Sequence, residues 1–278
     1  MKSRDVAAVA VAMLTAALPA RAQFRTCPPD AVRAGDTCVD KYEASVWLVP
    51  AANRDGKDNR RLIEKIAKGE AALKDLQKGN AAQLGCTTEP YNLNGYPARF
   101  PLNGNWTPDP DSPLPPSPGV YAVSVPGVLP STCITWFRAE QACALSGKRL
   151  LNNQEWQRAA QGTPDAGSDN HLTDCAVQSQ GPSRTGARTD CASAWGARDM
   201  VGNVWEWVAD WGEAASGCST WIADDVACFG GSGGDHLPGA IMRGGLWDDG
   251  ANAGVFAAWM NERGPLDSGP GIGFRCGR

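Results

Sequence analysis

The stretch Asp199-Met-Val-Gly-Asn-Val-Trp-Glu-Trp207 is the most distinctive segment of the chain. Its tryptophans are large apolar residues that can fill a core lacking long helices. Taken singly, such a block is typical of ordinary core and turn residues, so order and spacing along the chain carry the information. Three further blocks are Cys38-Val-Asp-Lys-Tyr-Glu43, Ile134 to Trp136 with Gly147-Lys-Arg-Leu150 and Glu155-Trp156, and Arg243-Gly-Gly245 with Gly273-Phe-Arg-Cys276.

The composition indicates a globular protein. The 278 residues are enough for one large domain or two small ones. Hydrophobic residues make up 42% and charged residues 20%, which favours a packed core over disorder. With 32 Gly and 20 Pro, we expect many turns and irregular loops. The net charge of −4, without a basic run, argues against nucleic acid as a partner.

Residues 1–22 have the pattern of a secretory signal peptide. Lys2 and Arg4 precede an apolar run from Val6 to Leu18, and Ala20-Arg21-Ala22 matches a cleavage site. A membrane anchor is the alternative, but the run is shorter than the roughly 20 residues that a spanning helix needs. We therefore expect an exported protein, periplasmic or secreted, whose mature chain of residues 23–278 is one domain without a membrane span.

Ten cysteines follow the leader, and an even number in an exported chain predicts disulfides. Metal binding is the competing interpretation, but the chain has no Cys-x-x-Cys pair and two histidines. Spacing does not fix the connectivity. Short separations favour the pairs Cys27–Cys38, Cys175–Cys191 and Cys218–Cys228.

The first half of the chain has three regions of different character. Val39 to Trp47 predicts a strand or a bent strand. Residues 53–80 combine charges with apolar residues at helical spacing, and Gly69 divides them into two short helices. We expect this insertion to pack on the core; a partner-binding helix is the alternative. Residues 85–118 form a Pro-rich loop, which we place inside the domain rather than between two domains.

Two helices are expected after residue 134. Thr135 can cap the first and Gly147 can end it. Asn152 can cap the second, with Glu155 three residues later as in a capping box, and Gly162 ends it. Gly244 and Gly245 permit close backbone approach or positive φ.

Together the four blocks resemble the sulfatase-modifying-factor family, the domain of the formylglycine-generating enzymes. The resemblance covers about residues 36–48 and 119–278. It implies an α+β fold, a loop-rich variant of the C-type lectin fold. It also implies a disulfide between Cys143 and Cys276, which leaves Cys86 and Cys133 to pair.

The resemblance does not extend to the copper site of the family. Aerobic members of the family oxidise a target cysteine using copper held by two thiolates. Aligned on Arg243-Gly-Gly-Leu-Trp247, those thiolates fall at Asp249 and Gly254, and the family's serine is Leu246. Cu(I) needs sulfur ligands. We therefore expect neither copper nor formylglycine generation.

Other members carry iron on three histidines, whereas this chain has His171 and His236. A site of two His with Asp235, Asp248 or Asp249 is possible by count. We expect instead that both histidines lie exposed on loops.

A calcium site is the metal centre that the resemblance predicts. The matching ligands are the side chains of Asp199 and Glu206 with the carbonyls of Gly202 and Val204. Oxygen donors at close spacing suit Ca²⁺. Turn capping by the two carboxylates is the alternative.

Two functions follow. The first is a non-catalytic module that binds a sugar, peptide or other polar ligand, or a protein, through the loops of residues 247–270. Its candidate binding residues are Trp247, Asp248, Asp249 and Asn252. The second is an oxidoreductase of the same superfamily with a different metal site.

Overall fold

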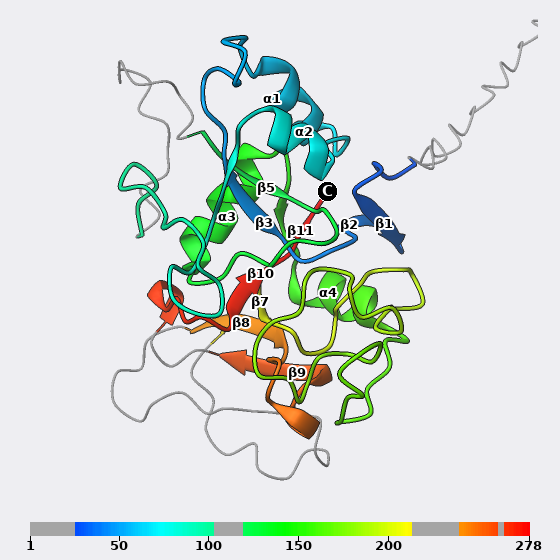
Figure 1. Cartoon of the computed structure of the whole chain (residues 1–278). Coiled ribbons are helices and arrows are strands. Elements are labelled where there is room, and N and C mark those ends of the chain that lie inside the picture. The colour runs from blue at the N-terminus through cyan, green and yellow to red at the C-terminus, as the bar shows by residue number, and fades with distance from the viewer. Residues whose placement is uncertain (1–25, 103–118, 213–238, 261–263) are drawn as a thin grey trace, which may run out of the picture.

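The computed structural model describes residues 26–102, 119–212, 239–260 and 264–278. Within these ranges the fold is mixed α/β, with short helices and three small sheets joined by long loops (Figure 1). The helices are α1 (Arg60–Ala67), α2 (Leu73–Lys78), α3 (Trp136–Leu145) and α4 (Asn153–Ala160), with 3-10 turns η1 (Gly250–Asn252) and η2 (Gly264–Leu266). The strands are β1 (Ala31–Ala34), β2 (Thr37–Asp40), β3 (Ser45–Leu48), β4 (Ala82–Leu84), β5 (Val120–Val123), β6 (Arg149–Leu150), β7 (Trp205–Gly212), β8 (Gly239–Gly244), β9 (Gly254–Met260), β10 (Ile272–Phe274) and β11 (Cys276–Gly277).

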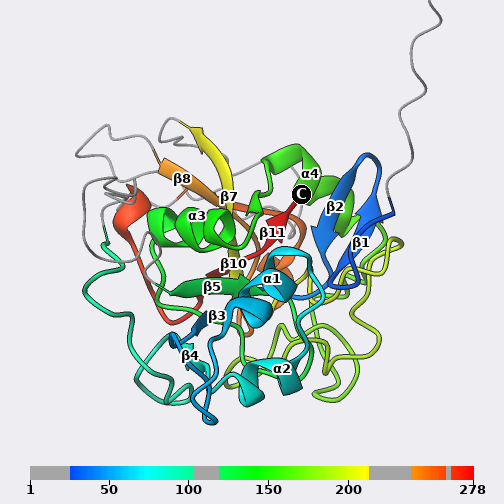
Figure 2. The same ribbon diagram turned by 90° about the horizontal axis from the view of Figure 1, so that it is seen from above.

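The sheets bring distant parts of the sequence together. One has the order β10-β7-β8-β9, and β10 runs parallel to β7 with Ile272 opposite Trp205. The second is β4-β3-β5. In the third, β1-β2-β11-β6, the final strand lies between β2 and β6, so that Gly277 pairs with Val39 and Cys276 with Leu150. Figure 2 shows β11 beside β2. The predicted bent strand is therefore two strands, β2 and β3, in different sheets.

Three tryptophans of the blocks fill the core. Trp156, Trp205 and Trp207 are buried, as expected. Trp211 lies at the end of β7 and is 40% exposed. Its ring packs edge-on against Trp136, with the centroids 5.1 Å apart. Trp211 therefore lies at the edge of the core, because β7 extends beyond it.

The helix ends follow the predicted capping residues. The Thr135 hydroxyl accepts a hydrogen bond from the backbone N–H of Arg138, and Gly147 follows α3 with φ +68°. Asn152 and Glu155 form the predicted capping box of α4. These local predictions are confirmed. Each capping bond joins residues only three apart in sequence, so neighbouring residues alone determine it.

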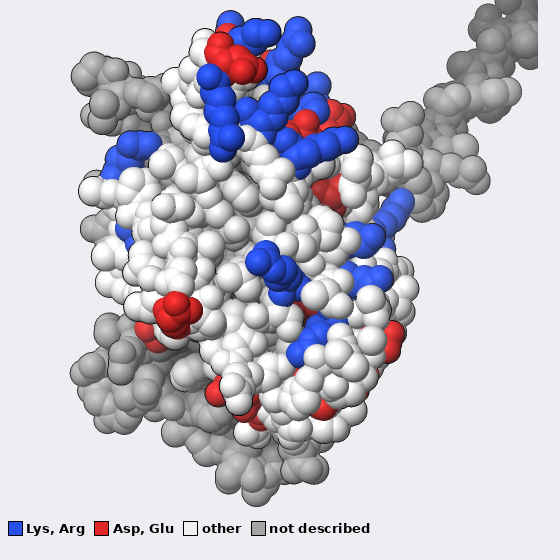
Figure 3. Space-filling view, viewed as in Figure 1, with Lys and Arg blue, Asp and Glu red and all other residues white. Residues whose placement is uncertain are grey.

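The insertion of residues 53–80 packs on the core. Gly69, with φ +69°, separates α1 from α2, as predicted. Leu62, Ile66 and Leu76 are buried and belong to the same apolar cluster as Trp47. The outer side is basic: residues 53–80 contain eight Lys or Arg and five Asp or Glu, and the blue side chains gather over α1 and α2 (Figure 3). Partner binding there stays an untested alternative.

Four disulfides join described residues. They are Cys27–Cys38, Cys86–Cys133, Cys143–Cys276 and Cys175–Cys191. Each is a pair that the sequence analysis favoured; Cys218 and Cys228 lie outside the described residues. Disulfides in this number indicate an oxidising compartment outside the cytoplasm. In the part of the chain that the structure describes, no helix combines the length and apolar character needed to cross a membrane.

Candidate functional site

The blocks meet at a buried ion pair. Glu206 on β7 and Arg275 beside β10 are both buried, and Arg275 Nη2 donates to Glu206 Oε1 at 2.7 Å. Arg275 also donates to the carbonyl oxygens of Asp40 and Arg198, at 3.0 and 2.7 Å. The indole N–H of Trp156 donates to Glu206 Oε2 at 2.7 Å. Three of the four blocks thus converge on the Glu206 carboxylate.

Two more buried carboxyl groups lie close to this pair. Glu43 accepts from the side-chain amide of Asn203 and from the backbone N–H of Val204. Asp199 Oδ2 accepts from the backbone N–H of Gly186 at 2.6 Å. Burial raises the pKa of Asp199 to about 6. Burial, with the charges of Asp199 and Glu206 next, also raises the pKa of Glu43 well above its usual range. The positive charge of Arg275 therefore acts on three buried carboxyl groups.

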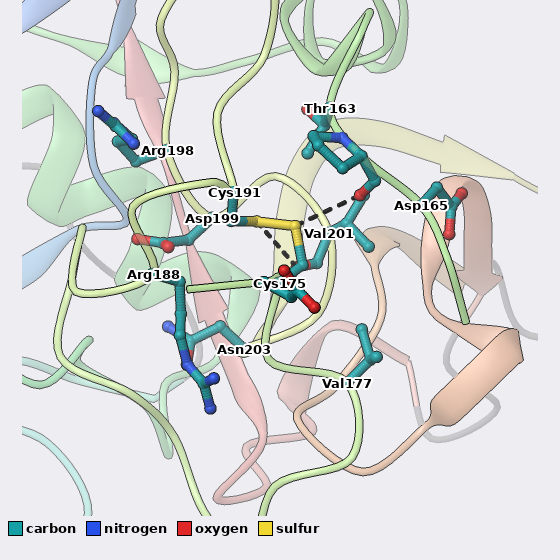
Figure 4. The surroundings of a disulfide bond; sticks show 12 residues. Thr163, Asp165, Cys175, Val177, Arg188, Cys191, Arg198, Asp199, Val201 and Asn203 are labelled. Carbon is teal, nitrogen blue, oxygen red and sulfur yellow. Dashed lines mark hydrogen bonds between the residues drawn. A yellow bond between two sulfur atoms is a disulfide. The ribbon is translucent and has the colours of Figure 1, made fainter. Parts of the chain in front are cut away.

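The calcium prediction depends on these same atoms. Asp199 and Asn203 have positive φ, +58° and +61°, and Figure 4 shows them on the loop beside the Cys175–Cys191 disulfide. Both oxygens of Glu206 already accept hydrogen bonds, so a cation there would have to replace donors from Arg275 or Trp156. Among the described residues, no cluster of three or more His, Cys, Asp or Glu is arranged to hold a metal. Calcium at Asp199, Gly202, Val204 and Glu206 stays a prediction.

The four candidate ligand-binding residues lie on one turn around η1. Asp249 Oδ2 accepts from the backbone N–H of Leu246 at 2.7 Å, which closes the turn. Burial, and to a lesser degree the charge of Asp248, raises the pKa of Asp249. Gly245, with φ +96°, lets the turn fold back on itself: a Cβ there would lie 2.4 Å from that of Ala253.

The exposed side of this turn differs from its inner side. Trp247 is half-buried and packs edge-on against Tyr91, with ring centroids 6.2 Å apart. Asp248 and Asn252 are exposed. The turn therefore offers two polar side chains and one aromatic edge, while Asp249 has a structural role that the sequence analysis did not anticipate.

The two positions aligned with the copper thiolates lie on this turn and the strand after it. Asp249 precedes η1, and Gly254 begins β9 and is buried. His171, the histidine of the described ranges, is exposed, with Nδ1 2.8 Å from Oδ1 of Asp169 on its own loop. Among the described residues, His171 forms no metal-binding cluster with Asp248 or Asp249. His236 and Asp235 lie outside them.

A groove between α4 and β9 was not predicted. It has a volume of about 530 Å³. The sequence does contain a signal for it, because amide side chains recur along one stripe of α4 without a carboxylate among them. The groove is lined by Asn153, Gln154, Gln157, Arg158, Gln161, Gly162, Val255 and Phe256.

The chain belongs to the family of sulfatase-modifying factor enzyme 1-like domains. The family model matches residues 119–278, which is more than half of the chain. The four sequence blocks, the loop-rich α+β fold and the Cys143–Cys276 disulfide agree with that membership.

Its relatives have different activities. The chain is 30% identical over 137 residues to hercynine oxygenase of Mycolicibacterium smegmatis, covering 44% of this chain and 31% of that protein. It is also 30% identical over 141 residues to the tail fiber receptor-binding protein of Bordetella phage BPP-1, covering 50% and 34%. The match thus spans about a third of each. Among solved structures, PvdO from Pseudomonas aeruginosa is 22% identical, with a TM-score of 0.38 and coverage of 55% of this chain and 63% of PvdO.

Proposed function

We propose that the chain is an exported binding module that does not generate formylglycine. One observation carries this proposal: the carboxylate of Asp249 replaces the first copper thiolate and closes the turn of residues 246–249. Gly254, at the second position, has no side chain to offer a metal. A carboxylate engaged by a backbone N–H cannot supply the sulfur that Cu(I) requires.

The module binds its ligand through the exposed side of the η1 turn. Asp248 and Asn252 supply charge and hydrogen bonds there, and Trp247 supplies an aromatic edge. Similarity to a phage receptor-binding protein over half of the chain supports a binding role. Because a disulfide-rich exported protein meets other cells and polymers, the ligand is an extracytoplasmic polar molecule or protein.

The catalytic half of the proposal is tested with a cysteine-containing sulfatase peptide. The mature chain is incubated with this peptide, oxygen and Cu(I), and the product is analysed by mass spectrometry. We expect no aldehyde product. Conversion of the peptide at more than the rate of a chain-free control would overturn the proposal.

The binding half is tested on a peptide library and a glycan array. Any reproducible ligand is then titrated against the double variant Asp248→Ala, Asn252→Ala, which should fold normally because both side chains are exposed. Loss of binding in the folded variant is expected. Unchanged binding would place the site elsewhere.

A second candidate function is an oxidoreductase with another metal. The similarity to hercynine oxygenase over 137 residues favours it. It requires a metal site that uses residues beyond the described ranges, or a partner chain. Stoichiometric iron in the purified protein would support it.

A further inference from the structure

The insertion of residues 53–80 gives the molecule a positive end. It contains eight Lys or Arg and five Asp or Glu, whereas the rest of the chain contains 18 and 25. The helices α1 and α2 form one end of the molecule, and β9 lies at the opposite end (Figure 1). Blue side chains predominate over α1 and α2 (Figure 3). An acidic chain thus carries a local excess of positive charge at one end.

Most of these cations are free to meet an external anion. Seven of the eight are exposed, and Lys65 is half-buried. Ion pairs join Arg60 to Asp58 and Lys65 to Asp75. The other six cations form no ion pair with any residue that the structure describes. These six are Arg54, Lys57, Arg61, Lys68, Lys74 and Lys78.

The same surface offers little apolar area. Among the described residues, the large apolar side chains that are exposed all lie outside residues 53–80. The apolar residues of the two helices, such as Leu62, Ile66 and Leu76, are buried against the core. A partner of this surface is therefore held by charge, and nothing in it is suited to enter a hydrocarbon layer.

A hollow with a volume of about 620 Å³ lies between the start of α1 and the end of α2. Of the three acids in its lining, Asp58 and Asp75 are already paired with Arg60 and Lys65, and Asp55 forms no ion pair with a described residue. Against that one acid stand three of the unpaired cations. They are Lys57, Arg61 and Lys78. The hollow therefore has an excess of positive charge, which a phosphate group would offset.

Contacts between the two helices hold the hollow in shape. Asn59 is buried, and its Nδ2 donates to the carbonyl oxygens of Pro50 and Gly79 at 2.8 and 2.9 Å. Lys65 Nζ on α1 lies 2.7 Å from Asp75 Oδ1 on α2. The cations are thus carried on a fixed backbone, which reduces the entropy lost when a partner binds.

We propose that the α1–α2 end docks on the surface of a bilayer that contains anionic phospholipids. Cations spread over one end of a molecule match a plane of separate negative charges, each of which attracts its own Lys or Arg. One lipid phosphate lies in the hollow, and the surrounding cations contact neighbouring headgroups. The contact is peripheral, because the described surface has no large apolar side chain to insert.

The charge of the remaining chain sets the orientation. Its excess of acids is repelled by an anionic surface, so the molecule binds with α1 and α2 toward the lipid and with β9 away from it. The docking surface is separate from the η1 turn and does not rest on the function proposed for that turn.

The test is co-sedimentation of the mature, disulfide-bonded chain with vesicles. One set contains one third phosphatidylglycerol and two thirds phosphatidylcholine, and the other contains phosphatidylcholine alone. We expect binding to the first set only. Raising the salt from about 0.1 M to about 1 M shortens the Debye length from about 10 Å to about 3 Å, so the chain should be released. Binding to neither set, equal binding to both, or binding that resists salt would each overturn the proposal.

Neutralising the cations of the hollow locates the surface. The variant carries Lys57→Gln, Arg61→Gln and Lys78→Gln, and it should fold normally because all three side chains are exposed. Near an anionic surface each basic residue contributes about fivefold in affinity, so the variant should bind the phosphatidylglycerol vesicles about a hundredfold more weakly.

A matched control removes the same charge outside the insertion. It carries Arg33→Gln, Arg99→Gln and Arg184→Gln, three exposed residues, and should bind the vesicles almost as tightly as the wild type. An equal loss in both variants would overturn the proposal, because the net charge rather than this end of the molecule would then decide binding. Tighter binding to soluble polyglutamate than to vesicles of equal anionic charge would also overturn it, in favour of an acidic protein as the partner.

Discussion

Replacing Arg275 tests whether the buried ion pair is what holds the sequence blocks together. Arg275→Met keeps an unbranched stem but removes the guanidinium. Glu206, Glu43 and Asp199 would then be buried without their shared cation, and the carbonyls of Asp40 and Arg198 would lose donors. Removing one partner of a buried pair costs about 3–5 kcal/mol. We expect a loss of this size in the free energy of unfolding.

A surface pair of the same charge type provides the control. Arg60 and Asp58 lie 3.0 Å apart, but their side chains are 82% and 55% exposed. An exposed pair of this kind contributes little because solvent screens it, so Arg60→Met should leave the free energy of unfolding nearly unchanged. Both variants are unfolded in urea and followed by tryptophan fluorescence, since Trp156 donates directly to Glu206. Equal stability of the two variants would refute the reasoning.

Four more predictions concern pH, calcium and disulfides. Burial raises the pKa of Asp40 to about 6, although the charge of Lys148 lowers it. The proton bound to Asp40 therefore stabilises the folded state below about pH 4, and this contribution is lost as the pH rises through 6. Asp40→Asn should flatten the dependence of the melting temperature on pH between about pH 4 and about pH 7, and an unchanged profile would count against this prediction. If calcium binds at Asp199 and Glu206, the chain should melt higher in millimolar calcium than in chelator, and Glu206→Ala should abolish the difference; equal melting of the wild type would exclude the site. Thiol titration of the denatured, unreduced mature chain should find no free cysteine, whereas two would show that Cys218 and Cys228 are unpaired. Removing the Cys143–Cys276 bridge, whose cysteines lie 133 residues apart, should cost about 5 kcal/mol in the chain-entropy model.

Local signals were readable from the sequence. The caps at Thr135 and Asn152 and the break at Gly69 involve residues within one turn, so the pattern alone determines them. The family resemblance supplied Cys143–Cys276, which spacing could not fix.

Long-range polar contacts were not readable. Lys148, in the Gly147-Lys-Arg-Leu150 block, is buried and donates to Asp30 and Asp40 at 2.7 and 2.8 Å. More than a hundred residues separate it from either carboxylate, and no periodicity links them.

The η1 turn shows a different limit, because there a short-range hydrogen bond was not predicted. Sequence placed Asp249 with the exposed binding residues, yet a hydrogen bond to the Leu246 N–H turns its carboxylate inward. Asp249→Ala should therefore cost about 1 kcal/mol of stability. The α4–β9 groove depends on a bulge in β9, and register shifts of this kind leave no simple mark in the hydrophobic pattern.

The metal content of the native, disulfide-bonded chain tests the proposed function most directly. The protein is purified from an oxidising compartment without chelator and analysed for copper and iron by mass spectrometry. A binding module in which Asp249 and Gly254 stand at the thiolate positions should contain neither metal in stoichiometric amount. One copper or one iron ion per chain, retained after dialysis, would contradict the proposal and favour the oxidoreductase.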